Sequence, residues 1–418
     1  MNVWAPFAQM KGYSPKGEVI KASGAWLELS DGRRVMDGIS SWWVNNHGHN
    51  HPVIMAAITE QLSRYDQVIL ADFSHGQSAQ LAQRLAEVLP GDLQHVHYSD
   101  NGSTAVEIAM KMAFQSQANL GQGQRKRFVA FTGAYHGDTI GAMSLGERGP
   151  FNEHFWDLMF DVDFLTYGAI DEVRAYLSEH GDEVAAVILE PLVQGAAGMK
   201  FCSPEFLAQL RELTEEAGCW LIADEVMTGF GRTGTVFAVE QAGIVPDIIC
   251  LSKGITGGCL PISVTVTRPA VFEAFLGPDK RSAFLHGHSY TGNPIACAAA
   301  NAAFTLFESE DTLGRVAMME RVYRSVVSDF EALPSVVNVR ARGGIFAFEI
   351  EQGQAGYHNP VGGQVTDRCF AKGLYLRPLG NTVYLMPPFC VSEEELRAAL
   401  EVLRCSVADV VGEEADAH

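Results

Sequence analysis

The chain has 418 residues, of which 47% are hydrophobic and 19% are charged, so it can bury a large core and is too long for a single small binding module. Basic residues number 30 and acidic residues 50, and the resulting net charge of −20 would repel a nucleic-acid backbone or an anionic membrane. We therefore expect neither as a partner. No N-terminal signal sequence is recognisable and no stretch reaches the roughly 18 apolar residues of a membrane-spanning helix, so we expect a cytoplasmic protein.

The first predicted element is a hairpin within residues 1–47, in an otherwise loop-like segment. The sequence AWLELSDGRRVMDG has two short strand-like stretches, and Asp31-Gly32 between them is a typical tight-turn pair. We assign this N-terminal segment to a small domain that it shares with the C-terminal part of the chain.

Residues 48–308 alternate between strand-like and helix-like segments, which predicts a large domain. One helix is expected to begin after Ser203 and to end at Gly218, and another to follow Ser103. This alternation predicts an α/β fold, with a mostly parallel sheet flanked by helices. The five apolar runs of strand length are 95–100, 127–133, 185–191, 220–226 and 247–253.

The pattern changes from about residue 309, where we place the C-terminal part of a smaller α+β domain. GRVAMMERVYRSVVSDFEAL is amphipathic and predicts a helix, while VNVRARGGIFAFEIE predicts two paired strands. A final helix is expected to begin after Ser392, with Glu395 in the position of a capping box.

Polar and glycine-rich residues follow each predicted strand of the large domain. In parallel sheets, ligands bind outside the carboxyl ends of the strands, so we expect these residues to lie together in a site. They are Asp100-Asn101-Gly102-Ser103, Tyr135-His136-Gly137, Glu190-Pro191, Asp224-Glu225 and Ser252-Lys253-Gly254.

Several common cofactor sites are absent or poorly matched in the sequence. No Gly-Lys dipeptide occurs, which excludes a P-loop. The glycines of residues 229–234 match G-x-G-x-x-G, but they lie several residues beyond the preceding strand. A nicotinamide or flavin site is therefore kept only as the second choice, with a different cofactor chemistry. The histidine-rich stretches 47–51 and 286–288 lack the spacing of zinc ligands, and we expect no metal. The eight scattered cysteines are interpreted as reduced thiols.

Three features together favour pyridoxal phosphate as the cofactor. Lys253 follows a buried strand, where a partly desolvated amine could bind the cofactor aldehyde and then move a proton. Asp224 follows another strand and could keep the pyridine nitrogen protonated. Gly102 and Ser103 lie at the start of a predicted helix, whose amides could hold the phosphate.

The stretch DEVMTGFGRTG from Asp224, followed by Ser252-Lys253-Gly254, resembles the signature of class III aminotransferases. The resemblance extends over nearly the whole chain and implies a fold type I homodimer with active sites at the subunit interface. It also implies that Tyr135 packs against the cofactor ring. His288 and Ser289, in HGHSYTGNP, would bind the cofactor phosphate region, with the Ser289 hydroxyl contributed by the neighbouring subunit.

Within the class, the chain is similar to the subgroup that aminates 8-amino-7-oxononanoate in biotin synthesis, with S-adenosylmethionine as amino donor. SSWW before NNHGHNHP, VQGAAGM, Arg377-Pro378 and Tyr384-Leu-Met-Pro-Pro carry this similarity. It implies that Arg377 pairs with the remote carboxylate of the keto acid. The other residues that it places at the substrate are Trp42, Trp43, Tyr135, Lys253, Gly287 and Tyr384.

Phe7 leaves the identity of the amino donor open. Many users of S-adenosylmethionine have a tyrosine where this chain has Phe7, which also lies at the substrate by resemblance but has no hydroxyl. Phe7 and the HGHSYTGN segment also resemble members that take the amino group from lysine. The alternatives are therefore lysine as donor, another ω-amine transaminase reaction, or a non-enzymatic scaffold or binding role.

Overall fold

The computed structural model describes residues 2–354 and 356–415. Within them, a seven-stranded sheet has the order β4-β12-β11-β10-β7-β5-β6, in which β12 alone runs against its neighbours. The mostly parallel sheet predicted from the sequence is confirmed. The strands are β4 (His95–Ser99), β5 (Arg127–Phe131), β6 (Asp163–Leu165), β7 (Val184–Leu189), β10 (Trp220–Asp224), β11 (Ile248–Leu251) and β12 (Ser263–Thr267).

Helices cover both faces of this sheet because its central strands are apolar on both sides. Along β7, Val187 and Leu189 belong to the same core as Leu207 of α7 (Pro204–Ala217), whereas Ile188 belongs to the core that includes Ala109 of α4 (Gly102–Asn119). Alternate residues of one strand thus enter two different cores, as expected for a sheet buried on both faces. The other helices of this lobe are α2 (Pro52–Leu62), α3 (Gly76–Val88), α5 (Ile140–Ser144), α6 (Ile170–His180), α8 (Pro269–Glu273) and α9 (Pro294–Ser309).

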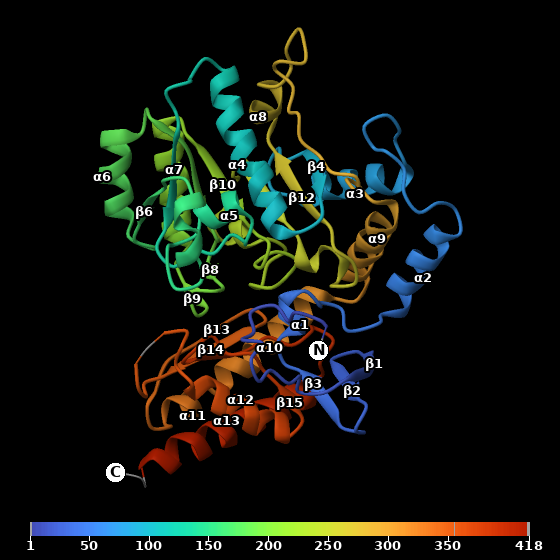
Figure 1. The fold of residues 1–418 in the computed structure, drawn as a ribbon, viewed down its shortest axis with the longest axis vertical. Helices are drawn as coiled ribbons and strands as arrows, with labels where there is room; N and C mark the ends of the chain where they lie inside the picture. Colours follow the sequence, from blue (N-terminus) through green and yellow to red (C-terminus); the bar gives the residue numbers. More distant parts are fainter. Residues whose placement is uncertain (1, 355, 416–418) are drawn as a thin grey trace.

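The two ends of the chain meet in a second lobe, where blue and red segments lie together below the central sheet (Figure 1). Strand β3 of the predicted N-terminal hairpin pairs in parallel with β15 near the C-terminus, while the domain boundaries at 47 and 308 stay a prediction. This lobe contains β1 (Val19–Ser23), β2 (Trp26–Leu29), β3 (Arg34–Asp37), β13 (Val336–Arg342), β14 (Ile345–Ile350), β15 (Leu374–Tyr375), β16 (Thr382–Leu385), α10 (Thr312–Ser325), α11 (Val327–Glu331), α12 (Val361–Ala371) and α13 (Glu393–Ala415).

The predicted helix ends agree with the observed caps. Ser203 Oγ accepts the amide of Phe206 at 3.2 Å, and Gly218 is left-handed at the end of α7. Ser392 and Glu395 form the predicted capping box at the start of α13. The helix predicted after residue 313 differs, because α10 ends at Ser325 and a separate α11 follows.

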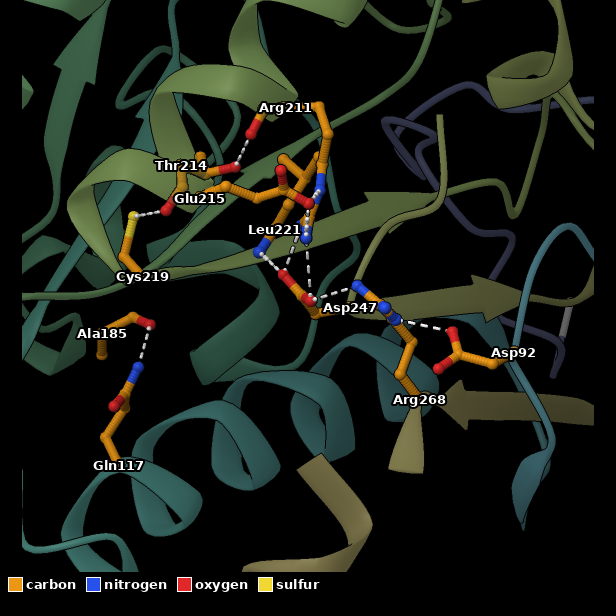
Figure 2. Close-up of polar contacts among 10 residues, drawn as sticks. All are labelled: Asp92, Gln117, Ala185, Arg211, Thr214, Glu215, Cys219, Leu221, Asp247 and Arg268. Carbon is orange, nitrogen blue, oxygen red and sulfur yellow. Dashed lines mark hydrogen bonds and ion pairs between the residues drawn. The ribbon is translucent and has the colours of Figure 1, made fainter. Parts of the chain in front are cut away.

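An ionic cluster centred on the buried Asp247 lies at the edge of the sheet opposite the predicted site (Figure 2). The carboxylate of Asp247, just before β11, accepts the amide of Leu221 at 2.8 Å and the guanidinium of Arg211 at 2.6 Å. Arg268, at the end of β12, lies 3.5 Å from the same carboxylate and bridges it to Asp92. This cluster fixes the starts of β10 and β11 relative to α7.

Two further expectations concern the state of the cysteines and the absence of a membrane-spanning helix. All eight cysteines are free thiols. In the part of the chain that the structure describes, no helix has the length and apolar composition needed to cross a membrane.

Candidate active site

A cavity of about 400 Å³ opens at the carboxyl ends of β4, β5, β7, β10 and β11. This volume suits a small molecule. The cavity brings together all five polar strand ends predicted from the sequence. Its wall includes residues 100–103, 135–137, 190, 224, 252 and 253.

One wall of the cavity is the N-terminus of α4. Asn101 caps the helix, because its Oδ1 accepts the amide of Thr104 at 3.1 Å. The first-turn amides of a helix have no partner within the helix and favour an anion. Gly102 allows the close packing here, since a Cβ atom at this position would lie 2.6 Å from Cγ1 of Val226. The amides of Gly102 and Ser103 therefore face a space suited to a phosphate.

The carboxylate of Asp224 lies on the cavity floor at the end of β10. His136 donates from Nδ1 to Asp224 Oδ2 at 2.7 Å, and the amide of Val226 donates to Oδ1 at 3.0 Å. Both side chains are buried. His136 Nε2 is also buried and has no hydrogen-bond partner among the described residues. The arrangement holds one carboxylate in a fixed orientation toward the cavity.

Glu190 positions the backbone around Tyr135. Its Oε1 accepts the amide of Tyr135 at 3.1 Å and its Oε2 accepts the amide of Gly195 at 2.9 Å. Burial raises the pKa of Glu190 to about 7, although the neighbouring His136 acts in the opposite sense. Tyr135 as a whole residue is 37% exposed and lines the cavity, where burial and Asp138 raise the pKa of its hydroxyl.

Lys253 enters the cavity two residues after the end of β11, in a left-handed backbone conformation with a φ of 45°. Its Nζ lies 5.0 Å from the centre of the Trp43 ring. Burial lowers the pKa of the Lys253 amine, while Asp224 and Glu190 act in the opposite sense. A lower pKa increases the fraction of uncharged amine, which is the form that can act as a nucleophile or take up a proton.

A second cluster lies beside this cavity and contains three residues predicted at the substrate. The guanidinium of Arg377 lies 4.5 Å from the Trp42 ring, and Phe7 contacts the same ring edge-on at 5.3 Å. Among the described residues, Arg377 forms no ion pair with a carboxylate. Trp43 joins this cluster to the cavity because it is the next residue and lines the cavity wall.

Tyr384 and the predicted loop residues are placed differently. Tyr384 is fully buried behind Trp43, whose Nε1 donates to its hydroxyl at 3.1 Å, so Tyr384 supports the wall without facing the cavity. Gly287, His288 and Ser289 are not among the residues that line this chain's cavity. Their predicted roles at the cofactor and substrate stay predictions.

Sequence reasoning did not assign roles to His136 and Glu190, although their strand-end positions were a signal. The wall formed by residues 258 and 260–262 was also missed, and it carries no recognisable motif. The dinucleotide alternative is not supported, because residues 229–234 form turns and do not open a helix. Within the described ranges, no three His, Cys, Asp or Glu side chains are grouped to hold a metal ion.

Comparison with known proteins identifies the family. The chain is 45% identical to the adenosylmethionine-8-amino-7-oxononanoate aminotransferase of Synechococcus elongatus, and the match covers 99% of both chains. A crystal structure of the enzyme of that name from Methanocaldococcus jannaschii has a TM-score of 0.94 at 32% identity, covering 98% of this chain and 97% of that one. A PLP-bound amine transaminase from an uncultivated Pseudomonas species has a TM-score of 0.92 at 28% identity, covering 98% and 99%. The family described as aminotransferase class-III matches residues 10–407, and the chain belongs to this family.

Proposed function

We propose that the chain uses pyridoxal 5′-phosphate to transfer an amino group from S-adenosylmethionine to 8-amino-7-oxononanoate, giving 7,8-diaminononanoate for biotin synthesis. The observation that carries the proposal is the convergence of Lys253, Asp224 and the N-terminus of α4 on one cavity, next to a guanidinium without an acidic partner among the described residues. The names of the relatives in Synechococcus elongatus and Methanocaldococcus jannaschii support the same substrates.

The residues of the cavity fit pyridoxal phosphate in the chemistry of their donors and acceptors. The first-turn amides of Gly102 and Ser103 would hold the phosphate, and the buried carboxylate of Asp224 would hold a proton on the pyridine nitrogen. Tyr135 would cover the ring, and Lys253 would supply the amine for the covalent link. When bound, the cofactor supplies an aldehyde that combines with amines and a ring that accepts an electron pair.

The chain's own groups account for proton transfer and for the orientation of the substrate. The Lys253 amine, with its pKa lowered by burial, would take a proton from one carbon and return it to another. Asp224 keeps its orientation because His136 and the amide of Val226 hold both of its oxygens. Trp43 covers the Lys253 side of the cavity and would exclude water from the reacting atoms.

The acceptor is supported by the cluster of Phe7, Trp42 and Arg377. A guanidinium held against an aromatic face and lacking a carboxylate partner among the described residues suits a substrate that ends in a carboxylate. Trp43 lines the cavity with Lys253, and the adjacent Trp42 contacts Arg377, so a long substrate would extend from Lys253 along the two tryptophans toward Arg377. The apolar rings between them suit the methylene chain of a nine-carbon keto acid.

We propose a homodimer in which the loop containing Gly287, His288 and Ser289 completes the site of the second copy. Ser289 is exposed in the single chain, and the nearby Leu285 is 75% exposed. Tyr290, next to Ser289, is also 64% exposed, and exposed apolar side chains grouped on one loop favour a protein interface. Sedimentation should give the mass of two chains, and Ser289→Ala should weaken binding of the cofactor phosphate. A stable monomer with full activity would contradict this arrangement.

The donor is tested by half-reactions with cofactor-loaded protein. S-Adenosylmethionine should abolish the visible absorbance of the lysine-linked cofactor, and subsequent addition of 8-amino-7-oxononanoate should restore that absorbance. Conversion by lysine alone would assign the alternative donor, which the absence of a hydroxyl on Phe7 favours. Lys253→Ala is the matched control and should bind the cofactor without the absorbance of the covalent link. If neither donor acts, the proposed function is wrong.

A further inference from the structure

Four consecutive residues next to the cavity have a backbone conformation that side chains other than glycine rarely adopt. Ser40, Ser41, Trp42 and Trp43 have φ angles of 51°, 50°, 86° and 70°. The flanking residues return to negative φ, with −132° at Ile39 and −98° at Val44. The segment is therefore a left-handed turn of L-residues, in which each Cβ crowds the following carbonyl oxygen. Contacts from other parts of the chain have to hold it.

The carboxylate of Asp37 makes two contacts at the start of this turn. Asp37 is fully buried at the end of β3. Its Oδ1 accepts the amide of Ile39 at 3.3 Å, and its Oδ2 accepts the hydroxyl of Ser41 at 2.7 Å. His49 Nε2 lies 2.9 Å from the same Oδ2. Burial acts to raise the pKa of Asp37, but the contacts with His49 and Ser41 outweigh it and lower the pKa, which favours the charged acceptor.

The turn sets the directions of two adjacent tryptophans. Trp43 lies over the Lys253 amine and donates to Tyr384, whereas Trp42 contacts Arg377. A right-handed turn would carry the side chains around its axis in the opposite sense. Both rings therefore keep their present neighbours only while the turn stays left-handed.

We propose that Asp37 is a positioning residue, whose buried carboxylate holds the left-handed turn and thereby places Trp43 at Lys253 and Trp42 at Arg377. This inference rests on the proposed function, because it assigns the two rings to the path of the acceptor. Asp37 itself does not line the cavity and acts through the turn.

The test compares Asp37→Ala with the double variant Asp37→Ala/Ser41→Gly. Loss of the carboxylate should raise the KM for 8-amino-7-oxononanoate by about tenfold to a hundredfold, the scale of a small misplacement at a binding site. Cofactor loading should remain that of the wild type, since Gly102, Ser103 and Lys253 are untouched. Glycine adopts a positive φ without steric cost, so adding Ser41→Gly should lower the KM part of the way back to the wild-type value. Asp367→Asn, which alters an exposed carboxylate paired with Lys16, is the control and should match the wild type.

A second pair of variants keeps the test valid if Asp37→Ala does not fold. Ser41→Ala and Ser41→Gly both lose the contact with Asp37, but only glycine tolerates a φ of 50°. The KM should therefore be higher in Ser41→Ala than in Ser41→Gly. An unchanged KM in Asp37→Ala, no rescue by glycine, or equal KM values in the two Ser41 variants would each overturn the proposal. Near-ultraviolet circular dichroism detects changes in the tryptophan environments and does not require an active enzyme. An inactive wild type would refute the proposed function, and not the positioning role of Asp37.

Discussion

His136 donates from Nδ1 to Asp224 Oδ2 across 2.7 Å, between two buried side chains that lie 88 residues apart in the sequence. A charged acceptor and a buried setting make this a strong hydrogen bond. It orients the carboxylate that would face the cofactor's pyridine nitrogen. The rate of amino transfer should therefore depend steeply on the charge of Asp224 and less steeply on His136.

Asp224→Asn should lower kcat by about three orders of magnitude, because an electrostatic loss of about 4 kcal/mol equals about three tenfold steps. His136→Gln should cost less, since the amide of Val226 still holds the other oxygen of Asp224. Single-turnover rates with saturating donor measure both effects, with cofactor occupancy determined separately. A loss of tenfold or less in Asp224→Asn would show that this carboxylate has another role.

Arg377→Ala should weaken binding of the keto acid by about 2–4 kcal/mol, the usual cost of removing one partner of a charge pair at a binding site. Arg377 is partly buried against Trp42 and forms no ion pair with other described residues, so its charge is available to a substrate. The donor half-reaction should change much less. Separate kinetics for the two half-reactions measure this asymmetry.

Arg397→Ala is a matched control for Arg377→Ala, since Arg397 is an exposed arginine paired with Glu393. It should leave both half-reactions unchanged. Equal losses in both half-reactions of Arg377→Ala, together with a lower melting temperature, would indicate structural damage and count against carboxylate recognition.

Much of the fold and the core of the site could be predicted because their signals are local in the sequence. The apolar run of β10 ends at Asp224 and that of β11 ends just before Lys253. The carboxyl ends of parallel neighbours meet at one edge, so the two groups had to lie close together. Strand β12 has no such signal: SVTVT alternates polar and apolar residues but is buried throughout, and its antiparallel direction follows from pairing with distant strands.

The parts of the site that could not be predicted depend on contacts between distant residues. Nothing in Ser40-Ser41-Trp42-Trp43 favours a left-handed turn, because serine and tryptophan have no preference for positive φ. The turn depends on Asp37 and on the packing of Trp43 against Tyr384. Tyr384 is buried behind Trp43 by the same packing, and its role at the substrate, which the resemblance implies, stays a prediction.

Asp247→Asn should destabilise the large lobe by about 3 kcal/mol, the scale for breaking a buried ion pair. The Asp247 carboxylate accepts bonds from Arg211 and the amide of Leu221 and lies near Arg268. An asparagine here removes the negative charge between Arg211 and Arg268. It leaves the buried guanidinium of Arg211 with the exposed carboxylate of Glu215 in place of a buried counter-charge (Figure 2). Urea unfolding followed by far-ultraviolet circular dichroism gives the free energies.

Asp279→Asn is the comparison for Asp247→Asn, because Asp279 pairs with Arg281 on the surface. Exposed pairs contribute little to stability, so the unfolding free energy should stay close to that of the wild type. Similar unfolding free energies for the two variants would mean that the cluster at the start of β10 and β11 does not stabilise the fold.

Glu225 should make the stability of the protein fall as the pH rises from about 4.5 to about 7. Its side chain is fully buried and accepts from the hydroxyl of Thr228 at 2.7 Å and the amide of Val239 at 2.9 Å. Burial nevertheless raises the pKa of Glu225 from 4.5 to about 7. Between these values the folded chain keeps a proton that the unfolded chain has released, so the unfolding free energy decreases with rising pH.

Glu225→Gln removes this ionisation and isolates its effect. The gap between 4.5 and about 7 corresponds to about 3.5 kcal/mol at about 1.4 kcal/mol per pKa unit, so the variant should gain about that much stability relative to the wild type over this window. His47, whose pKa burial lowers to about 4, titrates in both proteins and cancels in the difference. Urea unfolding at pH 4.5, 5.5, 6.5 and 7.5 gives the difference directly. If it does not change with pH, Glu225 is ionised in the folded protein at low pH, and its contacts with Thr228 and Val239 outweigh the cost of burial.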